Sequence, residues 1–99
     1  EYTLTSEGRA AMESWLNDPH PAASIRGVRV EFLSRLYVAR VLGCAVERII
    51  QAQYDACARR REDLLAEVSA EDSFGQLPLL LHIAQINAAM HWIQTEVRS

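Results

Sequence analysis

Residues 77–97 read LPLLLHIAQINAAMHWIQTEV, and this stretch decides the fold class. Large apolar residues recur in it at spacings of four, three, four, three and four, which is the period of an α-helix with one continuous apolar side. We call this series the seam; it comprises Leu79, Ile83, Ile86, Met90, Ile93 and Val97. The pattern predicts a helix that starts between Phe74 and Pro78 and continues to about Val97.

Signals for further helices precede this one. Thr5 or Ser6 can cap a first helix, which segment 18–21 ends because its two prolines lack an amide donor and favour extended geometry. Ser24 can cap a second helix, and Gly43 stands where that helix would stop. Ser73 with Gln76 could form a capping box for the last helix. These signals divide the chain into short, well-bounded helices.

A long third helix is expected over about residues 45–68, with a solvated charged run at residues 59–63. A helix of about 24 residues is roughly 36 Å long, whereas a compact domain of this size has a radius of gyration of about 13 Å. The predicted fold class is therefore all-α, with about four helices, two of them long and antiparallel. Such rods carry more apolar surface than one short chain covers, so a dimeric helical bundle is expected.

The seam can be assigned in two ways. It can form the dimer interface between two copies, or it can pack internally on the second and third helices, and periodicity alone does not decide between them. Small residues beside it, Ala84, Ala88 and Ala89, allow another helix to approach closely. The expected partner is a second copy of the chain, with the seam as the predicted interface.

Composition excludes several classes. The chain is 49% hydrophobic and 23% charged, as an ordinary globular domain is, and its net charge of −3 lacks the basic excess that a nucleic-acid binder needs. No DNA-binding residues are therefore expected in this chain. Cys44 and Cys57 have no metal or redox spacing and fit a reducing compartment. With no membrane span or signal segment, a cytoplasmic location without membrane partners is expected.

Residues that carry chemistry are scattered. His82 and His91 lie nine positions apart, about 180° around a helix, and His20 lies in the proline-bounded segment, so no metal site is expected. Glu62 and Asp63 are adjacent and diverge by about 100° on a helix. No nucleotide or catalytic motif occurs. The sequence therefore predicts no catalytic residues, no cofactor and no enzyme.

Three aromatic residues allow a different kind of site. Trp15, Tyr37 and Trp92 could line a pocket for a small, flat aromatic effector, because aromatic side chains combine a large contact area with a polar group. The simpler interpretation, which carries more weight, is that each of them packs in the core or at an interface.

The N-terminal stretch carries a resemblance to a known family. Residues 2–9, YTLTSEGR, alternate at first as a strand would and are followed by Trp15-Leu16 and a proline-containing break. This stretch resembles PadR-family transcriptional regulators, in which the last strand of the winged helix leads into a connecting helix. The rest of the chain is similar to the C-terminal domain of that family, the virulence activator alpha C-terminal type, in features that include Phe32-Leu33, Leu42-Gly43 and Trp92.

The resemblance implies a function and a domain layout. Residues 1–5 would be the remnant of the wing strand, residues 6–18 the connecting helix and residues 19–99 the C-terminal helical dimerisation domain. DNA would be bound through a winged helix-turn-helix that this chain lacks. The chain is thus expected to be the dimerisation and effector-sensing domain of a PadR-like regulator.

Two other classes stay open. A stand-alone helical domain that binds a small molecule would show a pocket and no self-association. A small all-helical enzyme similar to chorismate mutase would need converging cations, and Arg35, Arg48, Arg59 and Arg60 fall on different helical faces. Measuring the mass in solution separates the first alternative from the dimer.

Overall fold

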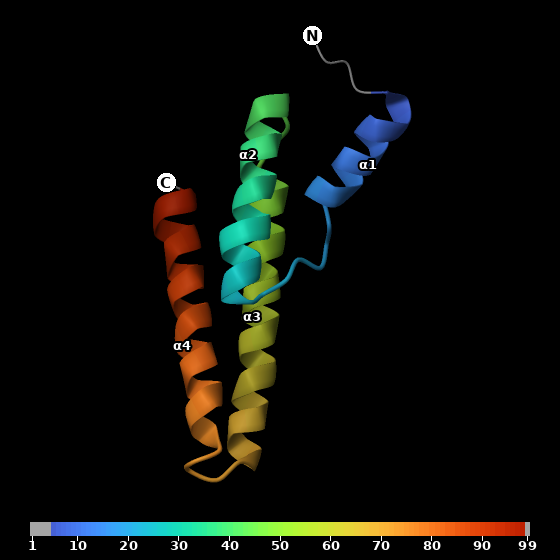
Figure 1. Cartoon of the computed structure of the whole chain (residues 1–99). Helices are drawn as coiled ribbons and strands as arrows, with labels where there is room; N and C mark the ends of the chain where they lie inside the picture. Colours follow the sequence, from blue (N-terminus) through green and yellow to red (C-terminus); the bar gives the residue numbers. More distant parts are fainter. Residues whose placement is uncertain (1–4, 99) are drawn as a thin grey trace.

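The computed structural model describes residues 5–98, and every element in this part of the chain is helical (Figure 1). The elements are α1 (Ser6–Leu16), the π-helical segment η1 (Gly27–Phe32) that continues into α2 (Leu33–Leu42), α3 (Glu47–Ala70), and α4 (Gln76–Trp92) with its π-helical end η2 (Ile93–Val97). The expected all-α class with four helices is confirmed. The strand expected over residues 1–5 lies, except for Thr5, outside the described residues.

The helix ends follow the capping signals. Thr5 and Ser24 each accept a hydrogen bond from the backbone amide three residues further on, at 3.0 Å. Gly43 ends α2 with φ 71°, in the left-handed region that favours glycine. The amides of Gly43 and Cys44 then donate to carbonyl groups in the last turn of α2. These three boundaries could be predicted because each depends on a local side chain or on glycine.

Two details differ from the expectation. The residue before α4 is Gly75, which gives no side-chain cap; in the turn that precedes the helix, the carboxylate of Asp72, and not Ser73, accepts from the amide of Gly75 at 2.7 Å. The first turns of the second helix have π geometry over Gly27–Phe32, which apolar periodicity does not reveal. A Cβ on Gly27 would lie 2.7 Å from that of Ala22, so only glycine lets the preceding linker run this close to the helix.

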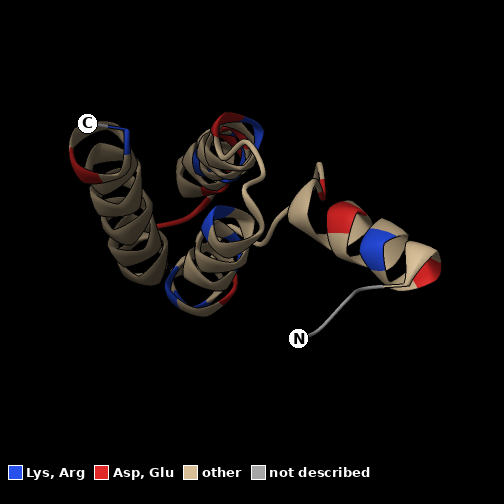
Figure 2. Ribbon diagram, turned by 90° about the horizontal axis from the view of Figure 1, so that it is seen from above, with Lys and Arg blue, Asp and Glu red and all other residues tan. Residues whose placement is uncertain are grey.

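The two long helices, α3 and α4, run antiparallel and are joined by a short loop (Figure 1). The η1–α2 helix lies beside them along only half of their length, the half nearer the C-terminus of the chain. In the view along the bundle, α2, α3 and α4 form a triangle and α1 stands to one side (Figure 2). The molecule is therefore elongated, with extents of 58 × 28 × 17 Å and a radius of gyration of 16.2 Å.

The hydrophobic core lies inside the triangle. It contains apolar side chains from all four helices: Leu16, Val28, Phe32, Leu36, Ala39, Ile49, Ile50, Cys57, Leu64, Ile83, Ile86, Ala89, Met90 and Ile93. The ring of buried Phe32 meets that of partly buried Trp92 edge to face, with centroids 6.1 Å apart. Of the residues of α1, only Leu16 is buried, so α1 is joined to the rest through its C-terminal end.

Candidate association surface

The structure places the predicted seam inside the single chain. Ile83, Ile86, Met90 and Ile93 are buried in the core, and Leu79 and Val97 are partly buried against it. An interface that used these side chains would have to open the core of each copy. The seam therefore has the internal role that periodicity had left open, and an association surface must be sought on another face of the molecule.

The opposite side of α4 is also apolar. Its residues fall within an arc of about 100° around the helix, roughly opposite the seam. We call this face the α4 stripe; it comprises Leu77, Leu80, Leu81, Ala84 and Ala88. The three leucines are 58%, 45% and 63% exposed. An ordinary surface helix places polar and charged residues at these positions.

No Asp, Glu, Lys or Arg occurs between Gln76 and Trp92. The ribbon of α4 is accordingly tan in Figure 2, and red and blue appear only at its C-terminal end. The α4 stripe is thus free of Asp, Glu, Lys and Arg, and His91 in the last turn is the first basic residue that follows it on this face.

A groove connects this face to α2. It has a volume of about 300 Å³, lies between η1–α2 and α4, and is lined by Ile25, Val28, Arg29, Leu33, Ala88, Ala89 and Trp92. Beyond it, α2 exposes a second apolar row, the α2 row, comprising Val30, Leu33, Tyr37 and Val41. The α4 stripe, the groove and the α2 row together form an extended apolar region of the surface.

The sequence-predicted aromatic residues do not form one pocket. Trp92 lines the groove, whereas Tyr37 is 66% exposed and lines shallow hollows further along α2. Trp15 lies at the end of α1, with its ring 5.5 Å from the guanidinium carbon of Arg35. Trp15 and Trp92 therefore pack in different places and Tyr37 is largely exposed, so the predicted shared effector pocket does not form around these three side chains.

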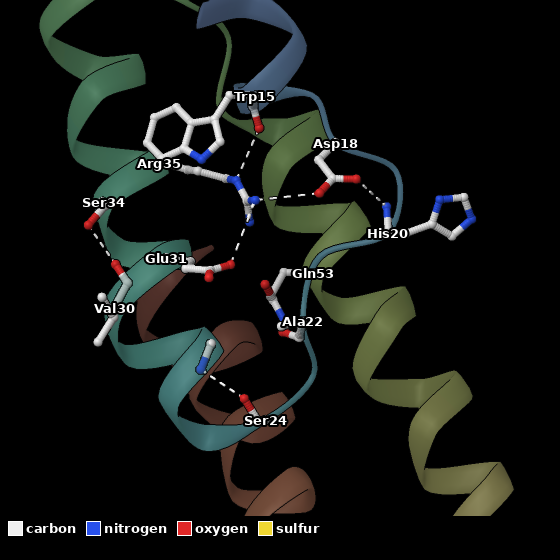
Figure 3. Close-up of polar contacts among 11 residues, drawn as sticks. Trp15, Asp18, His20, Ala22, Ser24, Val30, Glu31, Ser34, Arg35 and Gln53 are labelled. Atoms are coloured by element: carbon white, nitrogen blue, oxygen red, sulfur yellow. Dashed lines mark hydrogen bonds and ion pairs between the residues drawn. The ribbon is translucent and has the colours of Figure 1, made fainter.

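Arg35 fastens α1 to the body of the molecule. Its side chain is only 6% exposed, and its Nε donates to the carbonyl of Trp15 at 3.1 Å (Figure 3). Its Nη2 pairs with both Asp18, at 3.5 Å, and Glu31, at 3.9 Å. Helical periodicity alone does not explain why a charged side chain is buried among apolar neighbours here. The contacts to Trp15, Asp18 and Glu31 compensate the charge from three directions.

Groups capable of chemistry stay apart in the described part of the chain. No three His, Cys, Asp or Glu side chains gather there as a metal site requires. Burial raises the pKa of the Cys57 thiol, which a hydrogen bond from Gln53 lowers only in part. A thiol kept protonated in this way is a poor nucleophile.

The arginines differ in part from the expectation. Arg35 is committed to α1, as described above. Arg48 and Arg59 line one shallow hollow beside the linker, so for this pair the expected separation on different faces is wrong. Asp55 lies in the same hollow and supplies a compensating negative charge.

Residues 5–98 contain no helix with the length and apolar character that crossing a bilayer requires. Neither family models, nor characterised proteins, nor solved structures give a match to this chain.

Proposed function

We propose that this chain is a self-association module, and that the apolar region formed by the α4 stripe, the groove and the α2 row is the surface through which it associates. The observation that carries the proposal is the uncharged, exposed stripe of α4. Contiguous apolar patches rimmed by polar residues are typical of interaction sites on soluble proteins.

The total exposed surface supports the proposal. The chain exposes 6733 Å², whereas a compact monomer of its mass exposes about 5,700 Å². The difference is about 1,000 Å² and includes the surface of α1, which stands to one side; one partner in a standard interface buries about 800 Å². The radius of gyration, 16.2 Å, also exceeds the value of about 13 Å for a compact domain.

The regulatory role rests on the resemblance to the C-terminal domain of PadR-family regulators. The connecting helix and the four-helix order support it, and in that role a dimer would hold two DNA-binding domains at two half-sites. The reading frame upstream of Glu1 tests this part: a winged helix-turn-helix is expected there, and an unrelated domain would contradict the regulatory role.

The mass in solution tests self-association. Sedimentation equilibrium is expected to give about 22 kDa, twice the 11.2 kDa of one chain, at micromolar concentration. A mass of one chain at several hundred micromolar would contradict the proposal. It would instead favour a monomeric binding module, for which the 300 Å³ groove is at the lower end of the usual size of ligand pockets.

A further inference from the structure

The α4 stripe has an uneven distribution of side-chain size. Its leucines, Leu77, Leu80 and Leu81, lie in the N-terminal half of α4, and its alanines, Ala84 and Ala88, lie in the middle and the C-terminal half. The stripe is therefore raised at its leucines and low at its alanines, and the exposed side chain of His91 follows in the same arc beyond Ala88. A partner that fills this surface must be low where the stripe is raised, and raised where it is low.

A second copy in antiparallel orientation has that shape. If the two stripes face each other with Ala84 opposite Ala84, then Leu80 lies opposite Ala88 of the other copy, because 80 and 88 are equally far from 84. Leu80 of each copy then meets the low surface at Ala88, while Leu77 faces His91 and Leu81 faces Asn87 of the other copy. In a parallel pair, leucines would meet leucines and alanines would meet alanines, which would hold the helices apart and leave a void at the low end.

We infer that two copies of this chain pack with their α4 helices antiparallel, with Ala84 at the two-fold axis. The inference rests on the proposed function and adds the face, the direction and the register of the contact. The absence of Asp, Glu, Lys and Arg on the stripe fits this occupant, since a charge buried there would need a partner of opposite sign on the same apolar face.

The groove beside α2 agrees with the same symmetry. The two-fold axis is perpendicular to the plane that contains the two α4 helices. The α2 helices of both copies therefore lie on the same side of that plane. Leu81 lies at the edge of the stripe nearest to Trp92, and in this register it faces the partner at the level of Asn87, one residue before Ala88, where the groove begins. The exposed Leu81 side chain of each copy therefore enters the groove of the other copy.

Cysteine cross-linking tests the register. In a chain carrying Cys44→Ala, with Cys57 buried, Ala84→Cys alone is expected to form a covalent dimer on oxidation. Leu80→Cys alone and Ala88→Cys alone are expected not to do so, because self-contacts at these positions would be about 12 Å apart along the helix, at 1.5 Å per residue. A mixture of the Leu80→Cys and Ala88→Cys chains is expected to cross-link.

The controls separate this inference from the proposed function. Glu62→Cys, on an exposed position of α3, should remain uncross-linked. The masses of all variants are measured without oxidation at the same concentrations. Dimers in which Leu80→Cys links to itself as fast as Ala84→Cys, or in which Glu62→Cys links, would overturn the antiparallel register while leaving self-association intact. Monomers throughout would overturn both.

Discussion

A single buried arginine determines how α1 is held. Arg35 donates to the last turn of α1 through Trp15 and pairs with Asp18 just beyond it, whereas the apolar contact of α1 with the body is limited mainly to Leu16 and partly buried Met12. The position of α1 thus depends more on polar contacts than on hydrophobic burial. In the proposed regulator this helix would carry the DNA-binding domain, so Arg35 would set the direction in which that domain is held.

Replacing Arg35 by methionine tests this dependence. Arg35→Met keeps much of the apolar stem and removes the contacts to Trp15, Asp18 and Glu31. We expect a loss of about 2 kcal/mol in the free energy of unfolding, in the usual range for a disrupted polar network. Amide hydrogen exchange should accelerate mainly in α1. Arg40→Met, at an exposed position of the same helix, is the control and should change neither quantity; unchanged exchange in α1 of Arg35→Met would contradict the assignment.

At the scale of the elements, the join between α2 and α3 depends on one glycine. Gly43 has φ 71°, and a Cβ there would meet nothing within 4 Å. The cost of a side chain at this position is therefore conformational and not steric. We expect Gly43→Ala to lower the free energy of unfolding by about 1 kcal/mol.

Gly43→Asn provides the matched comparison, because asparagine adopts the left-handed region more readily than alanine does. In denaturant unfolding, the free energy of unfolding should fall clearly less for Gly43→Asn than for Gly43→Ala. Equal losses for the two variants would show that the effect does not come from the left-handed backbone.

The faces of the helices could be predicted only in part. On α3, helical spacing places Ile49, Ile50, Gln53, Cys57 and Leu64 near one side, and all five are buried. On the second helix the apolar residues form a wide band, of which Val28, Phe32 and Leu36 are buried, whereas Leu33, Tyr37 and Val41 are exposed. A wide apolar band shows that a helix has contacts on two sides, but periodicity does not tell which of them lies within the chain.

The same reason explains the outcome for α4. Its seam has strict helical spacing, and the structure buries most of it. Ala84 and Ala88, which the sequence predicts beside the seam, lie on the opposite, exposed face, because a helix that is apolar almost all round does not show where one face ends. The signal that could have revealed this face is the lack of Asp, Glu, Lys and Arg over 17 consecutive helical positions. Arg35 is a different case: its burial depends on Trp15 and Asp18, which are 20 and 17 positions away in the sequence.

At the scale of the whole molecule, the two faces of α4 should respond differently to the same substitution. Ile86→Glu places a carboxylate at a position that is 1% exposed, and we expect the helical circular dichroism signal to be lost. Leu81→Glu changes a side chain that is 63% exposed, so the chain should keep its helical content. If Leu81 enters the groove of a second copy, however, the new charge would be buried on association.

Burying an unpaired charge costs several kcal/mol, and each 1.4 kcal/mol is a tenfold change in affinity. Leu81→Glu should therefore weaken self-association at least a hundredfold in sedimentation equilibrium, without unfolding. Gln94→Glu adds the same charge to the C-terminal end of the helix, away from the stripe. The affinity of self-association of this variant should equal that of the unsubstituted chain. Because the stripe is uncharged, the affinity of the unsubstituted chain should also vary little between low and high salt, whereas an interface of ion pairs would weaken. A folded Leu81→Glu chain that associates as tightly as the original would exclude the α4 stripe as the contact.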